Sequence, residues 1–137
     1  MKIQRAELIG VAGVADLTVD LAGGPGGEPH HQVLVTGPSG AGKTRLIEVL
    51  LAAKEAIRPY GPLAPGASWI RSGSAAKVRL TFHLDEAERD FAGATSALLQ
   101  AEVIFHPTRV DAEADDGLRA VLGRYSHNAS HGKVEFT

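Results

Sequence analysis

Residues 37–44 constrain this chain more than any other stretch, because they read Gly-Pro-Ser-Gly-Ala-Gly-Lys-Thr. This order fits the phosphate-binding loop pattern of Gly, four residues, then Gly-Lys-Ser/Thr. The pattern needs a strand before it and a helix after it. Residues 33–35 (Val-Leu-Val) form a short apolar run typical of a buried strand, and residues 46–51 begin an amphipathic stretch typical of a helix. The sequence therefore predicts a strand, a phosphate-binding loop and a helix, rather than a glycine-rich turn that matches by chance.

Each part of this loop has an expected role in holding a nucleotide and its metal ion. The three glycines lack a Cβ, so the backbone can approach a ligand closely. The amides of residues 39–44 are expected to point at phosphate oxygens, helped by the positive end of the helix dipole. Lys43 is expected to reach the β- and γ-phosphates, and the Thr44 hydroxyl to ligate Mg²⁺. The predicted nucleotide-binding residues are Gly37, Ser39, Gly40, Ala41, Gly42, Lys43 and Thr44.

Composition excludes several classes of protein. A length of 137 residues predicts one domain with a real core, and 44% hydrophobic with 22% charged residues is ordinary for a globular protein. A net charge of −2 gives no global attraction to nucleic acid, and the absence of cysteine excludes disulfides and thiolate metal sites. No stretch approaches 18 apolar residues and the N-terminus does not read as a signal peptide. We expect a soluble, cytoplasmic protein without a membrane span.

The front of the chain predicts an antiparallel meander ahead of the loop. Residues 2–9 and 17–21 read as strands separated by a glycine-containing break. The helix after the loop is expected to run to about Ile57, because Arg58 precedes a proline and is biased away from helical geometry. Its expected apolar stripe is Leu46, Leu50, Ala53 and Ile57.

The rest of the chain predicts further short strands and helices. The alternation of residues 77–84 indicates a half-exposed antiparallel strand. The other expected elements are a short strand over 68–71, a helix after Asp85 whose stripe (Ala87, Phe91, Ala94, Leu98) is weakened at Gly93, a strand over 103–105, a helix over 111–123, a polar loop over 125–132 and a last strand over 133–137.

Asp85 and Glu86 are the only local match to the carboxylate pair that holds Mg²⁺ and orients water in phosphate-loop enzymes (Walker B). The strand that carries this pair is normally buried on both faces. Here the strand over 77–84 alternates, with polar residues along one face. We therefore predict that Asp85 caps a helix rather than serving catalysis.

His127 and His131 stand four residues apart, a spacing that can bind a metal ion on a helix. They lie in a stretch rich in Ser, Asn and Gly, and no third ligand is in view. A solvated loop is the favoured interpretation.

Several stretches together resemble the N-terminal lobe of the RecF/SMC-like ATPases of the ABC class. They are Met1-Lys2-Ile3 followed by Leu8, the strand over 17–21, the loop over 37–44, Leu46-Ile47-Glu48 and the alternating Val78, Leu80 and Phe82. The resemblance covers about the first 84 residues. It implies an α/β P-loop NTPase lobe in which a small antiparallel sheet lies over the nucleotide. It also implies ATP and Mg²⁺ as cofactors, the loop residues as contacts, and nucleotide-driven dimerisation that controls DNA or another partner.

The chain also departs from this family. It lacks a Leu-Ser-Gly-Gly signature and a convincing Walker B strand. We therefore expect residues 1–137 to be a single, incomplete lobe that self-associates or is completed by a second chain, and that hydrolyses ATP only when completed. Two alternatives stay open. One is a small nucleotide-type kinase, since the loop also resembles that of guanylate kinases. The other is a nucleotide-dependent interaction module without hydrolysis.

Overall fold

The computed structural model describes residues 1–23, 29–30, 33–38, 42–59, 66–73 and 75–130, with side chains up to residue 125. Within these residues the fold is mixed α/β. The strands are β1 (Lys2–Ile9), β2 (Leu17–Asp20), β3 (Ala76–His83), β4 (Leu98–Phe105) and β5 (Val110–Ala114). The helices are α1 (Lys43–Ile57), α2 (Glu86–Ala92) and α3 (Asp116–Ser130), with a 3₁₀ turn η2 (Gly66–Trp69).

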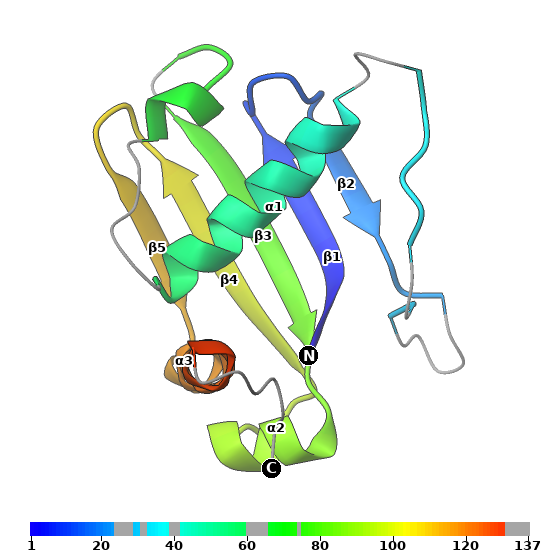
Figure 1. The fold of residues 1–137 in the computed structure, drawn as a ribbon, viewed down its shortest axis with the longest axis vertical. Coiled ribbons are helices and arrows are strands. Elements are labelled where there is room, and N and C mark those ends of the chain that lie inside the picture. Colours follow the sequence, from blue (N-terminus) through cyan, green and yellow to red (C-terminus); the bar gives the residue numbers. More distant parts are fainter. Residues whose placement is uncertain (24–28, 31–32, 39–41, 60–65, 74, 131–137) are drawn as a thin grey trace.

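The five strands form one antiparallel sheet in the order β2-β1-β3-β4-β5. Helix α1 crosses one face of the sheet, whereas α2 and α3 lie at one end of it (Figure 1). The predicted meander of the first two strands and the predicted helix over 43–57 are confirmed. No helix in the described parts of the chain is both long and apolar enough to span a membrane.

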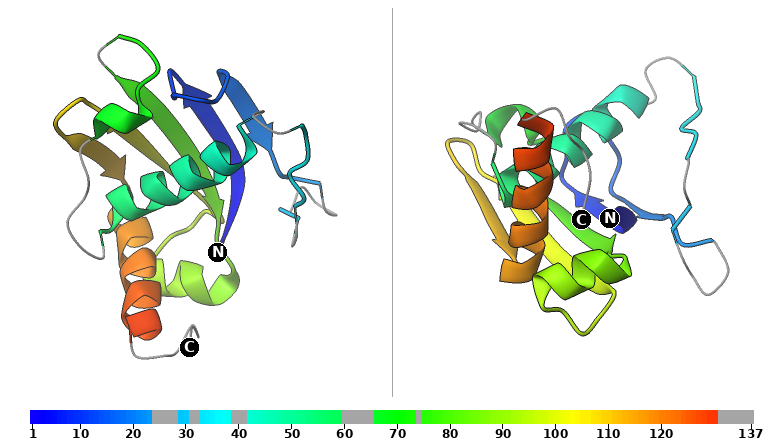
Figure 2. Two further views of the ribbon diagram at one scale, coloured as in Figure 1. Left: turned by 45° about the horizontal axis from the view of Figure 1, so that its top comes forward. Right: turned by 60° about the horizontal axis from the view of Figure 1, so that its bottom comes forward.

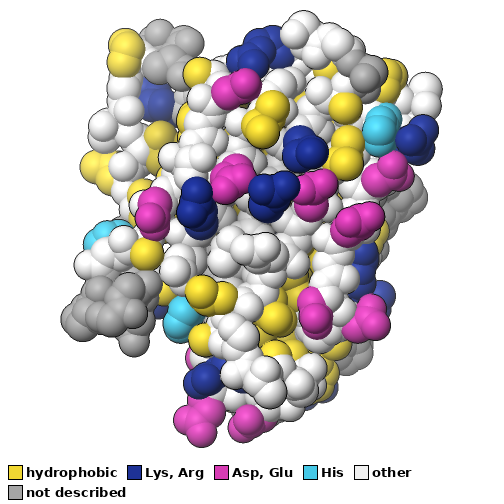
Figure 3. Space-filling view, turned by 180° about the vertical axis from the view of Figure 1, so that it is seen from behind, with side chains coloured by type: hydrophobic (Ala, Val, Ile, Leu, Met, Phe, Trp, Pro, Cys, Tyr) yellow, Lys and Arg dark blue, Asp and Glu magenta, His cyan; other side chains and the backbone are white. Residues whose placement is uncertain are grey.

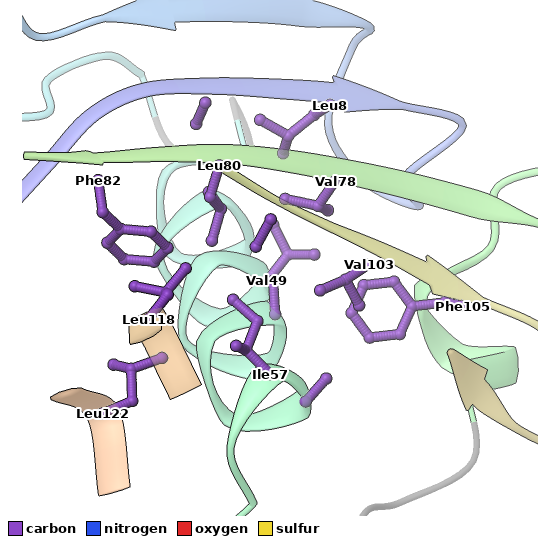
Figure 4. Packing of buried hydrophobic residues seen from close by; sticks show 14 of the residues in the cluster. Leu8, Val49, Ile57, Val78, Leu80, Phe82, Val103, Phe105, Leu118 and Leu122 are labelled. Atoms are coloured by element: carbon purple, nitrogen blue, oxygen red, sulfur yellow. The ribbon is translucent and has the colours of Figure 1, made fainter. Parts of the chain in front are cut away.

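The core lies between the sheet and α1. Alternate residues of β3 (Val78, Leu80 and Phe82) are buried, as the sequence predicts for a half-exposed strand. They face a stripe on α1 formed by Val49, Ala53, Ala56 and Ile57, and the side chains of Leu118 and Leu122 from α3 close one end (Figure 4). Ala53 and Ile57 agree with the predicted stripe, whereas Val49 and Ala56 lie outside it and the predicted Leu46 and Leu50 are only partly buried. Burying each of the larger side chains contributes about 1.5–3 kcal/mol.

The other face of the sheet carries a ladder of alternating charges (Figure 3). Arg79 in β3 lies 2.9 Å from Glu102 in β4 and 3.3 Å from Glu7 in β1. Two further cations complete the ladder: Arg5 pairs with Glu7 at 3.2 Å, and Lys77 pairs with Glu102 at 3.8 Å. The hydrogen bond from Arg79 lowers the pKa of Glu102, although each exposed pair contributes only modestly to stability.

The predicted strand over 33–35 is wrong. These residues adopt no regular structure, and their exposed fractions are 51% for Val33, 85% for Leu34 and 37% for Val35. The sheet ends at β2, which pairs with β1 alone, so it gives residues 33–35 no described strand to pair with. An apolar run becomes a strand only when neighbouring strands satisfy its backbone.

The predicted strand over 68–71 is also wrong. The chain forms the 3₁₀ turn η2 there, and only Ile70 makes an isolated bridge, to Val11. The turn packs tightly because Gly66 is buried, and a Cβ on it would lie 2.5 Å from the carbonyl oxygen of His106. Trp69 then packs on Phe105, with ring centroids 6.0 Å apart.

The helix after Asp85 is shorter than predicted. Gly93 ends α2 in the left-handed conformation (φ 66°), with its N–H donating to the carbonyls of Arg89 and Asp90. Leu98 therefore does not lie on a helix but begins β4, which is longer than the predicted strand over 103–105.

The predicted helix over 111–123 divides into a strand and a later helix. Residues 110–114 alternate apolar and acidic and pair with β4, so a period of two prevails over the helical tendency of Ala and Glu. Helix α3 then continues to Ser130, where a polar loop was expected. The predicted strand over 133–137 lies outside the described residues.

Candidate phosphate-binding site

The site is built around the start of α1. The helix begins at Lys43, directly after Gly42, which has a φ of 90°. Among the described residues no side chain caps this end, and no acidic residue lies in the first turn. Its N–H groups therefore keep the partial positive charge that attracts anions.

Lys43 joins the two described ends of the loop. Its Nζ donates a hydrogen bond to the carbonyl oxygen of Gly37, so the Lys43 side chain joins the seventh residue of the loop to the first. Thr44 is exposed in the first turn of α1. The structure thus brings Gly37, Gly42, Lys43 and Thr44 together, while the predicted contacts Ser39, Gly40 and Ala41 lie outside the described residues.

Gly42 packs directly against the turn between β1 and β2. A Cβ on Gly42 would lie 2.5 Å from the carbonyl oxygen of Gly13 and 3.9 Å from the Cα of Val14. A residue with a side chain would clash there and would also be strained at this positive φ. The turn therefore supports the end of the loop, and glycine is required at position 42.

Arg45 holds the start of α1 to two other segments. Its Nε donates to the carbonyl oxygen of Ala12 at 3.0 Å, and a second nitrogen donates to the carbonyl oxygen of Ser68. The guanidinium carbon lies 4.0 Å from the centroid of the Trp69 ring, a cation–π contact. One side chain thus fixes α1 against both the β1–β2 turn and η2.

Arg71 fixes the same turn from the other side. Its backbone N–H donates to the carbonyl oxygen of Gly10 at 2.8 Å, and its guanidinium contacts the carbonyl oxygen of Val14 at 3.0 Å and Asp16 at 2.6 Å. Asp16 also accepts from the N–H of Gly10 at 2.9 Å. This backbone hydrogen bond, followed by the one from Arg71, lowers the pKa of Asp16. Asp16 is therefore a structural carboxylate.

Sequence reasoning missed Arg45, Trp69 and Arg71 as parts of the site. The position of Arg45 directly after the motif is a sequence feature that could have identified it as part of the site. Trp69 and Arg71 give no such signal, because the sequence of their stretch is typical of a strand. Their place beside the loop depends on contacts between segments that are distant in sequence, such as the bond from the Ala12 N–H to the Trp69 carbonyl at 2.9 Å.

The predicted capping role of Asp85 is confirmed. Its Oδ1 accepts from the N–H of Glu88 at 2.8 Å, and Glu88 Oε1 accepts from the N–H of Asp85 at 2.9 Å, which is a capping box. Helix α2 lies at the far end of the sheet from the start of α1 (Figures 1 and 2). Asp85 and Glu86 therefore do not face the phosphate-binding loop.

No group of three potential metal ligands comes together among the residues that the structure describes. His127 lies within α3 rather than in the predicted loop, but the side chains of His127 and His131 are outside the described part. Two cavities lined by described residues, of about 260 and 430 Å³, also lie away from the phosphate-binding loop and share Met1 in their walls.

Comparison with known proteins supports the fold. No protein-family model matches the sequence, and no curated protein matches it. Among solved structures, the chain is similar to one described as an SMC head bound to the C-winged helix domain of ScpA, with a TM-score of 0.56 and 15% sequence identity. The match covers 88% of this chain and 40% of that one, so this chain spans less than half the length of its structural neighbour. The mixed α/β fold, with its antiparallel sheet, is thus similar to part of an SMC head.

Proposed function

We propose that this chain binds ATP with Mg²⁺ through residues 37–44, as the phosphate-binding lobe of a RecF/SMC-like ATPase. The observation that carries the proposal is the bond from Lys43 Nζ to the Gly37 carbonyl, across the start of a helix that no described side chain caps. An ammonium in that place can exchange a neutral carbonyl for a phosphate oxygen, and charge-assisted hydrogen bonds are the stronger ones.

The neighbouring residues support the same role. The N–H groups at the start of α1 have no side-chain acceptor in the part of the chain that the structure describes, and they suit an anion. Thr44, exposed beside Lys43, is the residue that would ligate Mg²⁺, and the ion would neutralise phosphate charge. The contacts of Arg45 and Arg71 hold the β1–β2 turn in place against the start of α1, so Gly42 and Lys43 are supported before a ligand binds.

Hydrolysis needs more than these residues supply. Asp16, a carboxylate of the turn that supports the loop, is already bonded to Gly10 and Arg71, and Asp85 caps a distant helix. Positioning an attacking water in line with the γ-phosphate requires a further group. We therefore propose that turnover depends on another chain, and that nucleotide-driven association controls a partner, with DNA as one candidate. The complex of the structural neighbour with ScpA supports a role in partner binding.

The antiparallel sheet that includes the N-terminal meander favours this proposal over a small nucleotide kinase. Its similarity to an SMC head points the same way, although that similarity concerns the fold alone.

Calorimetric titration of the purified chain with ATP and Mg²⁺ tests the binding proposal. Lys43→Ala should weaken binding by about 1.5–3 kcal/mol, or roughly 10- to 150-fold, because a charge-assisted contact is lost. Lys54→Ala is the matched control, since Lys54 lies on the same helix and is paired with Glu55 at 3.3 Å. Equal affinities for the two variants would contradict the assignment.

A steady-state assay tests the dependence on a partner. The isolated chain should bind ATP but hydrolyse it far more slowly than about 1 s⁻¹, the lower end of the usual range for enzymes. Turnover at or above that rate by a monodisperse monomer would show that the chain holds a complete catalytic site.

A further inference from the structure

Helix α1 has a second apolar face that the sheet does not cover. Ile47 and Leu51, one turn apart, are 49% and 59% exposed. They line a cavity of about 260 Å³ together with Met1, Ile3, Leu50 and Phe82, which we call the apolar groove. Among its described lining residues, only Lys2 and Lys54 have charged side chains. An exposed apolar surface that is also concave is typical of a binding site.

The same chain carries a protruding apolar segment. Residues 33–35, which we call the arm, are exposed and make no backbone hydrogen bond to any described residue. Residues 33–38 stand off from β2 on the side of the sheet where α1 begins (Figures 1 and 2). Three exposed apolar side chains, on a backbone that makes no hydrogen bond to a described residue, would be stabilised by a partner that covers them.

We propose that the arm of one copy of this chain lies in the apolar groove of a second copy, and the reverse. One chain supplies both a protruding apolar segment and an apolar hollow, so a two-fold axis relating two copies would form the same contact twice. A two-fold arrangement also closes, because no arm or groove remains to recruit a third copy. This proposal does not depend on nucleotide binding.

Sedimentation velocity of the purified full chain tests the proposal. Wild type should sediment as a dimer. Leu34→Lys in the arm and Leu51→Lys in the groove should each raise the dimer dissociation constant at least about tenfold, because each buries an unpaired charge. Leu98→Lys is the matched control, since Leu98 is 41% exposed but belongs to neither surface, and it should remain dimeric. A monomeric wild type, or a dimer that both surface variants leave intact, would overturn the proposal.

Mixing the two variants distinguishes reciprocal exchange from pairing between two arms. In the mixture, the wild-type arm of the Leu51→Lys chain can enter the wild-type groove of the Leu34→Lys chain. One of the two contacts is therefore restored, and the mixture should associate more strongly than either variant alone. A mixture that stays as monomeric as its components would contradict the exchange.

Two measurements separate failure of this proposal from failure to fold or to bind nucleotide. Far-ultraviolet circular dichroism should show folded variants, since both substituted side chains are already more than half exposed. Their affinity for ATP should match that of wild type, because neither residue lies in the phosphate-binding loop.

Discussion

Glu88 offers the sharpest test of how the helices are held to the sheet. It is fully buried, and its carboxylate binds three groups from different parts of the chain. Oε1 lies 2.8 Å from the amino group of Met1 and accepts from the N–H of Asp85, while Oε2 accepts from the Tyr125 hydroxyl at 2.6 Å. Burial, and then the bond to Glu88, raises the pKa of Tyr125, so its hydroxyl stays protonated as a donor.

Glu88→Ala should therefore destabilise the chain severely. Removing one partner of a buried ion pair costs about 3–5 kcal/mol, because the other charge stays buried without compensation. That is a large part of the roughly 5–15 kcal/mol that holds an ordinary domain together. At about 4 °C per kcal/mol for a chain of this size, the melting temperature should fall by roughly 12–20 °C. Glu88→Gln keeps the shape and one acceptor and should cost less.

Urea denaturation of the chain without an N-terminal extension, followed by circular dichroism and by Trp69 fluorescence, measures this loss. Tyr125→Phe is the companion variant, because it removes one hydroxyl and should cost only about 1–3 kcal/mol, the cost of an acceptor left without its donor. If Glu88→Ala lowers the free energy of unfolding by less than about 1 kcal/mol, the buried cluster does not stabilise the fold as argued.

Three further predictions concern the site and its surroundings. Gly42→Ala should cost about 1–3 kcal/mol of stability and weaken ATP binding, because the added Cβ would lie 2.5 Å from the carbonyl oxygen of Gly13. Gly73→Ala is the control, because Gly73 also has a positive φ (80°) but open space around it, so this variant measures the cost of the backbone strain alone. Urea denaturation and calorimetry of both variants give the two losses. Asp16 has a lowered pKa, so its contribution to stability is complete above about pH 4 and is lost as the pH falls through its folded-state pKa. Asp16→Asn should flatten the decline in urea midpoint between about pH 4 and 2, and an unchanged decline would contradict this. Glu86→Gln should leave ATP affinity and stability within about 0.5 kcal/mol of wild type, and a larger change would reopen a role for Glu86 at the nucleotide.

The sequence predicts best those elements that its local pattern determines. Helix α1 follows from a motif at one end and a proline after the other, and its bounds agree with the prediction. β3 follows from strict alternation, and the cap at Asp85 follows from its place before an acidic first turn. In each of these elements, the residues that decide the structure are neighbours in the sequence.

The elements that the sequence did not predict depend on distant partners. Residues 110–114 look helical by composition and become β5 because β4 lies beside them. Residues 33–35 look like a buried strand and stay exposed because the sheet ends at β2. At the site, the motif places Lys43 at the start of α1, whereas the supporting role of Arg71 arises only when the chain brings it to Asp16, 55 residues away.

The charge ladder on the open face of the sheet has a consequence for any nucleic-acid partner. Lys77, Arg79 and Arg5 alternate with Glu7 and Glu102, so every cation of the ladder already has a carboxylate beside it. A nucleic-acid backbone approaching this face would meet carboxylates at close range and would release few counterions. Binding there would be weak and nearly independent of salt concentration. Strongly salt-dependent DNA binding by this chain would therefore point to a different surface.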